Sequence, residues 1–194
     1  MALSGPGFAV EIARGVPTRL VLAGHDAALS EKTRALLEGK RFKIDISDDR
    51  RGVEWGGAIK NVLAIGCGIL DGLGLGGNAK AALITQGAAE LGLIVRAVGG
   101  KERTVYGPAC LGDLILTATG EVSRNRRLGE KLGQGKAVAQ ARGEISTVAE
   151  GVDSVESAHA AATARNLDVP VVNALWRIIR EGEPPGILLT AMGF

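Results

Sequence analysis

Aromatic residues and cysteines are scarce in this 194-residue sequence, with aromatics at 3% and only two cysteines. An interior with so few rings must be built from aliphatic side chains, and the 29 glycines allow neighbouring backbones to approach closely. Cys67 and Cys110 lie in apolar segments, without the C-x-x-C or Cys/His spacing of a metal site. We therefore expect two buried, reduced thiols, which fits a cytoplasmic protein, and we expect no metal site.

A strong charge imbalance is also missing. The net charge of +2 is too small to indicate a nucleic-acid partner or a membrane-surface partner. Every long apolar run is interrupted by glycine or by a charged residue, so we expect neither a signal peptide nor a membrane span. Hydrophobic residues at 46% and charged residues at 23% are typical of a folded globular protein. The length allows one good hydrophobic core, or one domain plus the remnant of another.

The most informative absence is a dinucleotide fingerprint, because no G-x-G-x-x-G stands between a strand and a helix. The first fifty residues still alternate between strand and helix patterns. Residues 16–23 and 41–47 are predicted strands, and residues 26–38 are a predicted helix that Asp26 caps. Two strands are too few for a complete doubly wound sheet, so this part is interpreted as the tail of an α/β unit.

From Gly52 onward the apolar residues follow a helical period, so the remaining chain is predicted to be all-α. The charged stretch 47–51 is the predicted domain boundary, which gives one part over residues 1–50 and another over 51–194. The first predicted helix is a central buried one around Trp55–Ile69, and the second is Asn78–Val98 with Asn78 as its cap. The other predicted helices are Gly112–Thr119, Arg124–Leu132, Thr147–Asn166 and one from Pro170 to Gly182. Thr147 and Glu150 are predicted to form a capping box at the start of the helix Thr147–Asn166.

Lys60 is the only charged residue between Glu54 and Asp71, in the middle of the helix that is predicted to be buried. Desolvation disfavours the charged form of a buried lysine, so the pKa of its amine can fall into the range of a general base. The alternative is that the side chain extends along its methylene groups and places the amine in water. The spacing alone favours neither interpretation.

The segment SRNRR (123–127) follows a Thr119-Gly120 turn and opens a predicted helix. Free backbone N–H groups at a helix start, a serine hydroxyl and a guanidinium that can bond two oxygens together form a suitable site for a phosphate. A small phosphorylated molecule fits this site better than DNA does. The alternative is an ordinary solvated basic face.

Asp113 lies between apolar neighbours, so it is either a helix cap or the partner of a substrate hydroxyl or of Lys60. Glu150 is either half of the capping box with Thr147 or a ligand-binding residue. Residues 4–7 (SGPG) form either a phosphate-binding loop or a plain turn.

Five segments, in order from residue 3 to about residue 180, resemble the bacterial NAD(P)-dependent glycerol-3-phosphate dehydrogenases. They are LSGPGFA (3–9), the run from Gly52 to Gly87, CLGDLILT (110–117), SRNRRLG (123–129) and VAEGV (148–152). Any one of them could arise by chance, but five in order, with Lys60 and the S-R-N triplet in place, make a specific match.

The resemblance implies a mainly α fold. An all-α C-terminal dehydrogenase domain, similar to the C-terminal domain of 6-phosphogluconate dehydrogenase, would follow the α/β tail of a truncated Rossmann domain.

The resemblance also implies which residues form the site. Lys60 would be the catalytic residue, which also contacts the substrate, and the other substrate-binding residues would be Gly5, Gly7, Asp113, Ser123, Arg124 and Asn125. Ala9, Arg124, Val148 and Glu150 would lie on the side of the cofactor, NAD or NADP.

The implied reaction interconverts dihydroxyacetone phosphate and glycerol 3-phosphate, the backbone of phospholipids. Lys60 would exchange a proton with the substrate while the phosphate is held far from the reacting carbon. Because the fingerprint is missing, the resemblance implies a fragment that binds NAD or NADP weakly or not at all and is inactive alone, with a homodimer among its possible assemblies.

Two residues depart from the family pattern. Gly7 stands where Ser or Thr is usual, and Gly77 replaces a common Asp.

Two alternative functions stay open: a non-catalytic helical module that binds a phosphorylated metabolite or self-associates, and a related β-hydroxyacid or sugar-acid dehydrogenase domain.

Overall fold

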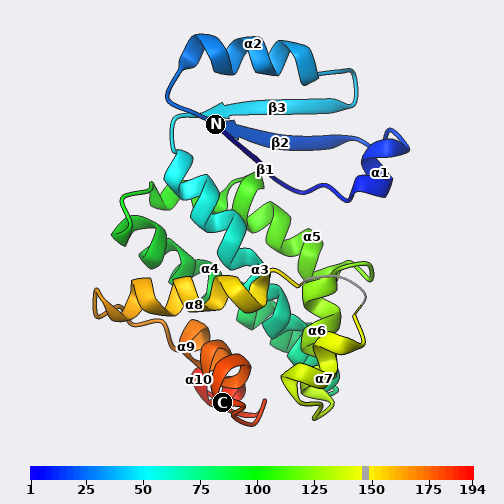
Figure 1. The fold of residues 1–194 in the computed structure, drawn as a ribbon, viewed down its shortest axis with the longest axis vertical. Helices are drawn as coiled ribbons and strands as arrows, with labels where there is room; N and C mark the ends of the chain where they lie inside the picture. The colour runs from blue at the N-terminus through cyan, green and yellow to red at the C-terminus, as the bar shows by residue number, and fades with distance from the viewer. Residues whose placement is uncertain (146–148) are drawn as a thin grey trace.

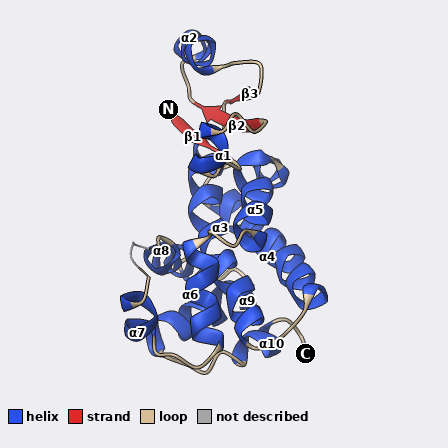
Figure 2. Ribbon diagram, turned by 90° about the vertical axis from the view of Figure 1, so that its right-hand side faces the viewer, coloured by secondary structure: helices blue, strands red, loops and turns tan. Residues whose placement is uncertain are grey.

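The structure is a computed structural model, and it describes residues 1–145 and 149–194. A small sheet with the helix α2 forms one end of the molecule, and a body of helices forms the rest (Figures 1 and 2). The fold class predicted from the sequence, an α/β tail followed by an all-α part, is confirmed.

The sheet has three strands in the order β1-β2-β3. The strand β1 (Ala2–Ser4) pairs antiparallel with β2 (Thr18–Ala23), which runs parallel to β3 (Phe42–Ser47). Between them, α1 covers Ala9–Ala13 and α2 covers Ala27–Leu37, with the Asp26 carboxylate capping α2 as predicted. β2 and β3 confirm the two predicted strands within two residues, whereas β1 is too short to give an alternating pattern.

The helix α3 (Arg50–Gly72) is the axis of the helical body (Figure 1). The helices that pack around it include α4 (Gly77–Ala97), α5 (Asp113–Thr119), α6 (Arg124–Gly133) and α8 (Gly151–Thr163). By length and composition α3 could cross a membrane, but 72% of its most apolar stretch is buried inside this protein. The prediction of a central buried helix is therefore confirmed.

The closest packing in the body joins α3 to α6 through four glycines. A Cβ atom on Gly68 would lie 1.9 Å from Arg126 O, and one on Gly129 would lie 1.9 Å from Ile65 O. Gly72 and Gly133 make similar approaches to the facing backbone one helical turn further on. With no side chain between them, the two helices touch backbone to backbone, and this contact fixes their crossing.

Three details of the predicted helices are wrong. Gly76 caps α4, so Asn78 lies inside the helix and does not cap it. The helix α8 is shorter than predicted, and Thr147 of the predicted capping box lies outside the described residues. Asp113 does not cap a helix, because a π-helical turn (Pro108–Gly112) runs into α5 without a break.

Some helical segments were not predicted at all. They are α1, a 3₁₀ helix (Glu102–Tyr106), α7 (Val138–Gly143) and α10 (Ile187–Ala191). All are five or six residues long, which is too short for a helical period to show. The predicted helix from Pro170 is present as α9 (Pro170–Trp176) continued by a π-helical turn (Arg177–Glu181). It ends at Gly182 as expected, and Gly182 has the left-handed conformation that favours glycine.

Asp49 connects the start of α3 to the segment after α4. Its carboxylate accepts hydrogen bonds from Gly52 N at 2.9 Å, from Lys101 N at 2.8 Å and from Thr104 Oγ1 at 2.5 Å. Burial of Asp49 opposes ionisation, but these hydrogen bonds outweigh it and hold the pKa of the carboxyl below its usual value. The carboxylate form of Asp49 therefore stabilises the fold.

We predict that Gly129→Ala lowers the free energy of unfolding by about 3 kcal/mol, because the added methyl group must push α6 away from the α3 backbone. Urea denaturation measures the change. Gly143→Ala is the matched control, because it also adds a methyl group to a helical glycine but meets no atom within 4 Å. Equal stability of the two variants would contradict the close approach of α3 and α6.

We also predict that Asp49 contributes to the pH dependence of stability. Its folded-state pKa lies below the unfolded value, so its contribution is present at neutral pH and is lost as the pH falls through the folded-state pKa. Asp49→Asn should therefore be less stable than the parent at pH 7, and the difference should shrink as the pH falls from about 5 toward 3. Urea denaturation at several pH values measures both proteins, and a constant difference would contradict the assignment.

Candidate active site

A pocket of about 210 Å³ lies where the segment after β1 meets α3, α5 and the start of α6. It gathers residues that are far apart in the sequence, and all seven substrate-side residues expected from the resemblance line it. The lining residues are Gly5, Gly7, Phe8, Lys60, Asn61, Asp113, Thr117, Val122, Ser123, Arg124, Asn125 and Glu150.

Lys60 reaches this pocket from the middle of α3. Its amine Nζ lies 2.9 Å from Asp113 Oδ2 and 3.1 Å from Thr117 Oγ1. The side chains of Lys60 and Asp113 are only 14% and 13% exposed. Thr117 Oγ1 in turn donates to Asp113 Oδ1 at 3.3 Å, so the three groups form a closed triangle. This triangle holds the lysine amine at the wall of the pocket.

The structure corrects one part of the expectation for Lys60. The amine does not stand alone among apolar side chains, as the argument for a neutral lysine requires. It forms an ion pair with Asp113, so of the alternatives left open for Asp113 the structure shows the pairing with Lys60. The alternative in which the amine extends into open water is wrong.

Ser123, Arg124 and Asn125 lie at the start of α6, beside the same pocket. Ser123 is the N-cap residue, and its Oγ accepts a hydrogen bond from Arg126 N at 3.2 Å. The Arg124 side chain is about half exposed at 47%, whereas Arg126 points elsewhere and binds Asp71 at 2.7 Å. The pocket therefore receives a helix start and one guanidinium, which is a suitable arrangement for an anion.

A buried hydrogen-bond chain ties α6 to α3 and α8. Asn125 Nδ2 donates to Asn61 Oδ1 at 2.9 Å, and Asn125 Oδ1 accepts from Gly151 N at 3.0 Å. Asn61 Nδ2 donates to Glu150 Oε2 at 3.3 Å. Both the nitrogen and the oxygen of the Asn125 amide are therefore hydrogen-bonded. These bonds hold α3, α6 and the start of α8 together around the pocket.

The sequence reasoning did not include four residues that line the pocket, namely Phe8, Asn61, Thr117 and Val122. Two of them carried a usable signal. Asn61 is a polar neighbour of Lys60 in a helix that is otherwise apolar, and Thr117 stands four residues after Asp113, on the same face of a helix. Phe8 and Val122 are apolar and carried none.

Three of the four expected cofactor-side residues can be placed. Glu150 lies at the pocket, with Oε1 3.9 Å from a guanidinium nitrogen of Arg124. Ala9 is the exposed first residue of α1, next to Phe8. Val148 lies outside the described residues. The three expected residues that can be described are thus exposed, and two of them, Arg124 and Glu150, line the pocket.

Both cysteines are buried and unpaired, as predicted. Burial raises the pKa of the Cys67 thiol and of the Cys110 thiol to about 12, so both are protonated and unreactive near neutral pH. Among residues 1–145 and 149–194, no group of His, Cys, Asp and Glu is arranged to hold a metal ion.

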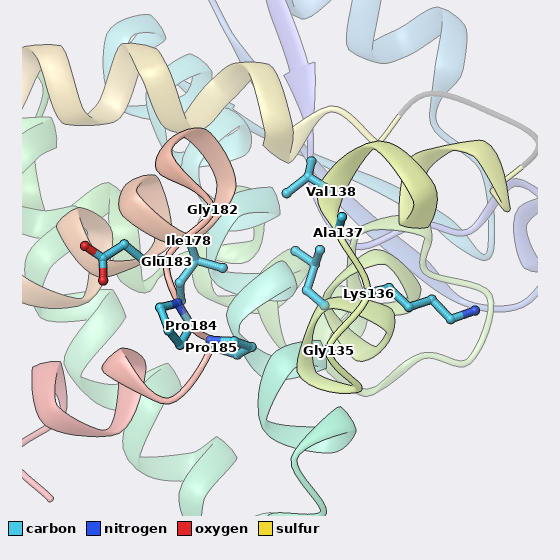
Figure 3. Close-up of a pocket in the computed structure, with 10 residues that line it drawn as sticks. Gly135, Lys136, Ala137, Val138, Ile178, Gly182, Glu183, Pro184 and Pro185 are labelled. Atoms are coloured by element: carbon cyan, nitrogen blue, oxygen red, sulfur yellow. The ribbon is translucent and has the colours of Figure 1, made fainter.

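A second pocket, of about 320 Å³, lies between the α6–α7 connection and residues 182–185 (Figure 3). Its two charged side chains are engaged elsewhere, since Lys136 binds Glu144 at 2.7 Å and Glu183 binds Arg177 at 2.7 Å. The rest of its lining is glycine, proline and aliphatic residues. It offers no group that would bind a phosphate and contains none of the expected site residues.

Comparison with known proteins connects this chain to a family. The family model described as "NAD-dependent glycerol-3-phosphate dehydrogenase C-terminus" matches residues 49–190. A glycerol-3-phosphate dehydrogenase [NAD(P)+] of Janthinobacterium sp. is 47% identical over 184 residues, which are 95% of this chain and 56% of the relative. The corresponding protein of Oleidesulfovibrio alaskensis is 44% identical over 183 residues, again 56% of its length.

Solved structures agree with this result. The crystal structure of glycerol-3-phosphate dehydrogenase from Coxiella burnetii superposes with a TM-score of 0.92 at 41% identity, covering 98% of this chain and 58% of that chain. The yeast enzyme superposes with a TM-score of 0.88 at 27% identity, covering 59% of that chain. The present chain therefore spans little more than half the length of its relatives. The chain belongs to the family of NAD(P)-dependent glycerol-3-phosphate dehydrogenases.

Proposed function

We propose that this chain carries the substrate-binding and catalytic side of a glycerol-3-phosphate dehydrogenase. The observation that carries the proposal is the Lys60 amine, held by Asp113 at 2.9 Å and Thr117 at 3.1 Å at the wall of a pocket that the start of α6 also lines. One pocket thus combines a proton-exchanging group with an anion site. Glycerol 3-phosphate and dihydroxyacetone phosphate need both of these features.

The anion site would hold the substrate phosphate. Arg124 and the first N–H groups of α6 would bind its oxygens, and the buried hydrogen bonds of Asn125 would keep the helix start in place. Gly5 and Gly7, after β1, leave room at the opposite wall. Phosphate binding at one end of the substrate then positions its C2 atom near Lys60, so binding far from the reacting carbon contributes to the rate.

Lys60 would exchange the proton at the C2 oxygen. In the reducing direction its ammonium form donates a proton to the carbonyl oxygen, and in the oxidising direction its neutral form accepts the proton of the hydroxyl. Asp113 and Thr117 aim the amine, because both contact Nζ directly. NAD or NADP, when bound, supplies the hydride chemistry at C2.

The residues present fit only the edge of such a cofactor. Ala9, Arg124 and Glu150 provide exposed groups beside the pocket, but no glycine loop between a strand and a helix is available to hold a diphosphate. We therefore propose that the 194-residue chain by itself binds NAD or NADP weakly or not at all and does not turn over substrate.

We place the domain boundary at residues 50 and 51, so that residues 1–50 belong to the nucleotide-binding domain and residues 51–194 form the all-α domain. The end of β3 at Ser47 and the start of α3 at Arg50 support this division.

A small phosphorylated metabolite is the proposed partner, rather than nucleic acid or a membrane, because the net charge is only +2. The unpaired buried thiols support a cytoplasmic location.

We predict that Lys60→Ala lowers kcat by a factor on the order of 10²–10⁴ in a version of the protein joined to a dinucleotide-binding segment, because the proton exchange at C2 is lost. The assay follows reduction of dihydroxyacetone phosphate by NADH or NADPH. Lys80→Ala is the matched control, since Lys80 also forms a partly buried ion pair, with Asp71, away from the pocket. Unchanged turnover in Lys60→Ala would remove the proton-exchange role and favour a non-catalytic phosphate-binding module.

We also predict that the 194-residue chain binds glycerol 3-phosphate in calorimetry but shows no turnover with NAD or NADP. Arg124→Ala should weaken this binding on the order of tenfold to hundredfold, because a hydrogen bond to a charged group contributes about 1.5–3 kcal/mol. Arg127→Ala, an exposed arginine on the same helix that does not line the pocket, is the control. Equal losses in the two variants would indicate general charge attraction instead of a phosphate site.

A further inference from the structure

Among the described residues, the charged side chains that line the pocket of Lys60 are balanced in sign. The two cations are Lys60 and Arg124, and the two anions are Asp113 and Glu150. Lys60 Nζ lies 2.9 Å from Asp113 Oδ2. A guanidinium nitrogen of Arg124 lies 3.9 Å from Glu150 Oε1. Each cation of the pocket therefore has an anion beside it before any substrate binds.

The two ion pairs differ in how easily they open. The side chains of Arg124 and Glu150 are both exposed, and water weakens the attraction between exposed charges. The Lys60 pair is buried, and Thr117 closes it by accepting a hydrogen bond from Nζ and donating one to Asp113 Oδ1. Breaking a buried pair is costly. A substrate anion can therefore take the place of Glu150 beside Arg124 more easily than the place of Asp113 beside Lys60.

The substrate needs only one of these cations for its phosphate. Arg124 and the start of α6 would bind the phosphate, and the C2 atom would lie beside Lys60. C1 is bonded directly to C2, so the group on C1 also lies close to Lys60 and Asp113. In glycerol 3-phosphate this group is an uncharged alcohol. A carboxylate on C1 would instead stand near the Asp113 carboxylate, with one ammonium shared between two anions, and like charges placed together in this way are strongly unfavourable.

We propose that Asp113 is a specificity-determining residue, which admits three-carbon phosphates with an uncharged group on C1 and excludes those with a carboxylate on C1. Lys60 is paired in advance, so it does not offer a free positive charge to an acid. This repulsive element against the wrong ligand accompanies the attraction of Arg124 for the phosphate. The proposal rests on the proposed function, because it takes C2 to lie beside Lys60. It also counts against a β-hydroxyacid or sugar-acid dehydrogenase, whose substrates carry a carboxylate.

The first test uses the unaltered 194-residue chain and three ligands that differ only at C1. They are glycerol 3-phosphate, the 3-phosphoglycerate with the same configuration at C2, and the primary amide of that acid. In calorimetry the acid should bind on the order of tenfold to hundredfold more weakly than glycerol 3-phosphate, because its carboxylate meets Asp113. The amide has nearly the same size as the carboxylate but no charge, so it should bind much more tightly than the acid.

The second test changes the residue itself. Asp113→Asn removes the negative charge and keeps an oxygen that can accept a hydrogen bond from Lys60. The preference for glycerol 3-phosphate over the acid should then fall by about tenfold or more, because the ammonium is free to pair with the C1 carboxylate. Asp153→Asn is the matched control, since Asp153 is an exposed carboxylate of α8 that does not line the pocket, and it should keep the preference of the parent.

The comparison is a ratio of two affinities in the same protein, so a general loss of phosphate binding cancels. The proposal is overturned if the parent binds the acid as tightly as glycerol 3-phosphate, or if the amide binds as weakly as the acid. A folded Asp113→Asn variant with the preference of the parent also overturns it. If that variant does not fold, the three ligands on the parent decide. A parent that binds none of the three ligands overturns the proposed phosphate site itself, whereas equal binding of all three leaves that site intact.

Discussion

The backbone contact between α3 and α6 is the constraint on which the rest of the structure depends. Gly68 and Gly72 on one helix face Gly129 and Gly133 on the other, and the distances leave no room for a Cβ atom at any of them. Glycine inside a helix costs up to about 1 kcal/mol relative to alanine, so four such positions need a compensating gain. That gain comes from the close packing of α3, which carries Lys60, against α6, whose first residues line the pocket.

The polar groups of the pocket use this crossing. Asn125 can bond Asn61 at 2.9 Å only because α3 and α6 lie so close together, and the bond from Gly151 N then attaches α8 to the same asparagine. A buried amide with both ends satisfied is rigid, and a partly satisfied one would be costly. The packing of small residues and the hydrogen bonds of the pocket therefore support each other.

The ion pair of Lys60 and Asp113 shows how the fold adjusts a buried charge. An unpaired ammonium on a side chain that is only 14% exposed would be unfavourable. The Asp113 carboxylate pairs with its charge, and Asp113 and Thr117 together fix the direction in which the amine points. The lysine is thereby kept as a directed hydrogen-bond donor. The proposed proton exchange needs this geometry more than it needs a lysine surrounded by apolar groups.

The sequence by itself determined the fold class, the buried helix around Lys60 and the helix start at Ser123, because these depend on periodicity and capping within a few neighbouring residues. Only the tertiary structure decided that Asp113 pairs with Lys60 and does not cap a helix, and that Asn61 and Thr117 belong to the pocket. These pairings join positions 53 to 89 residues apart, and they follow from how α5, α6 and the start of α8 pack against α3. A local pattern carries no information on where two distant helices cross, so that part of the site could be known only from the packed structure.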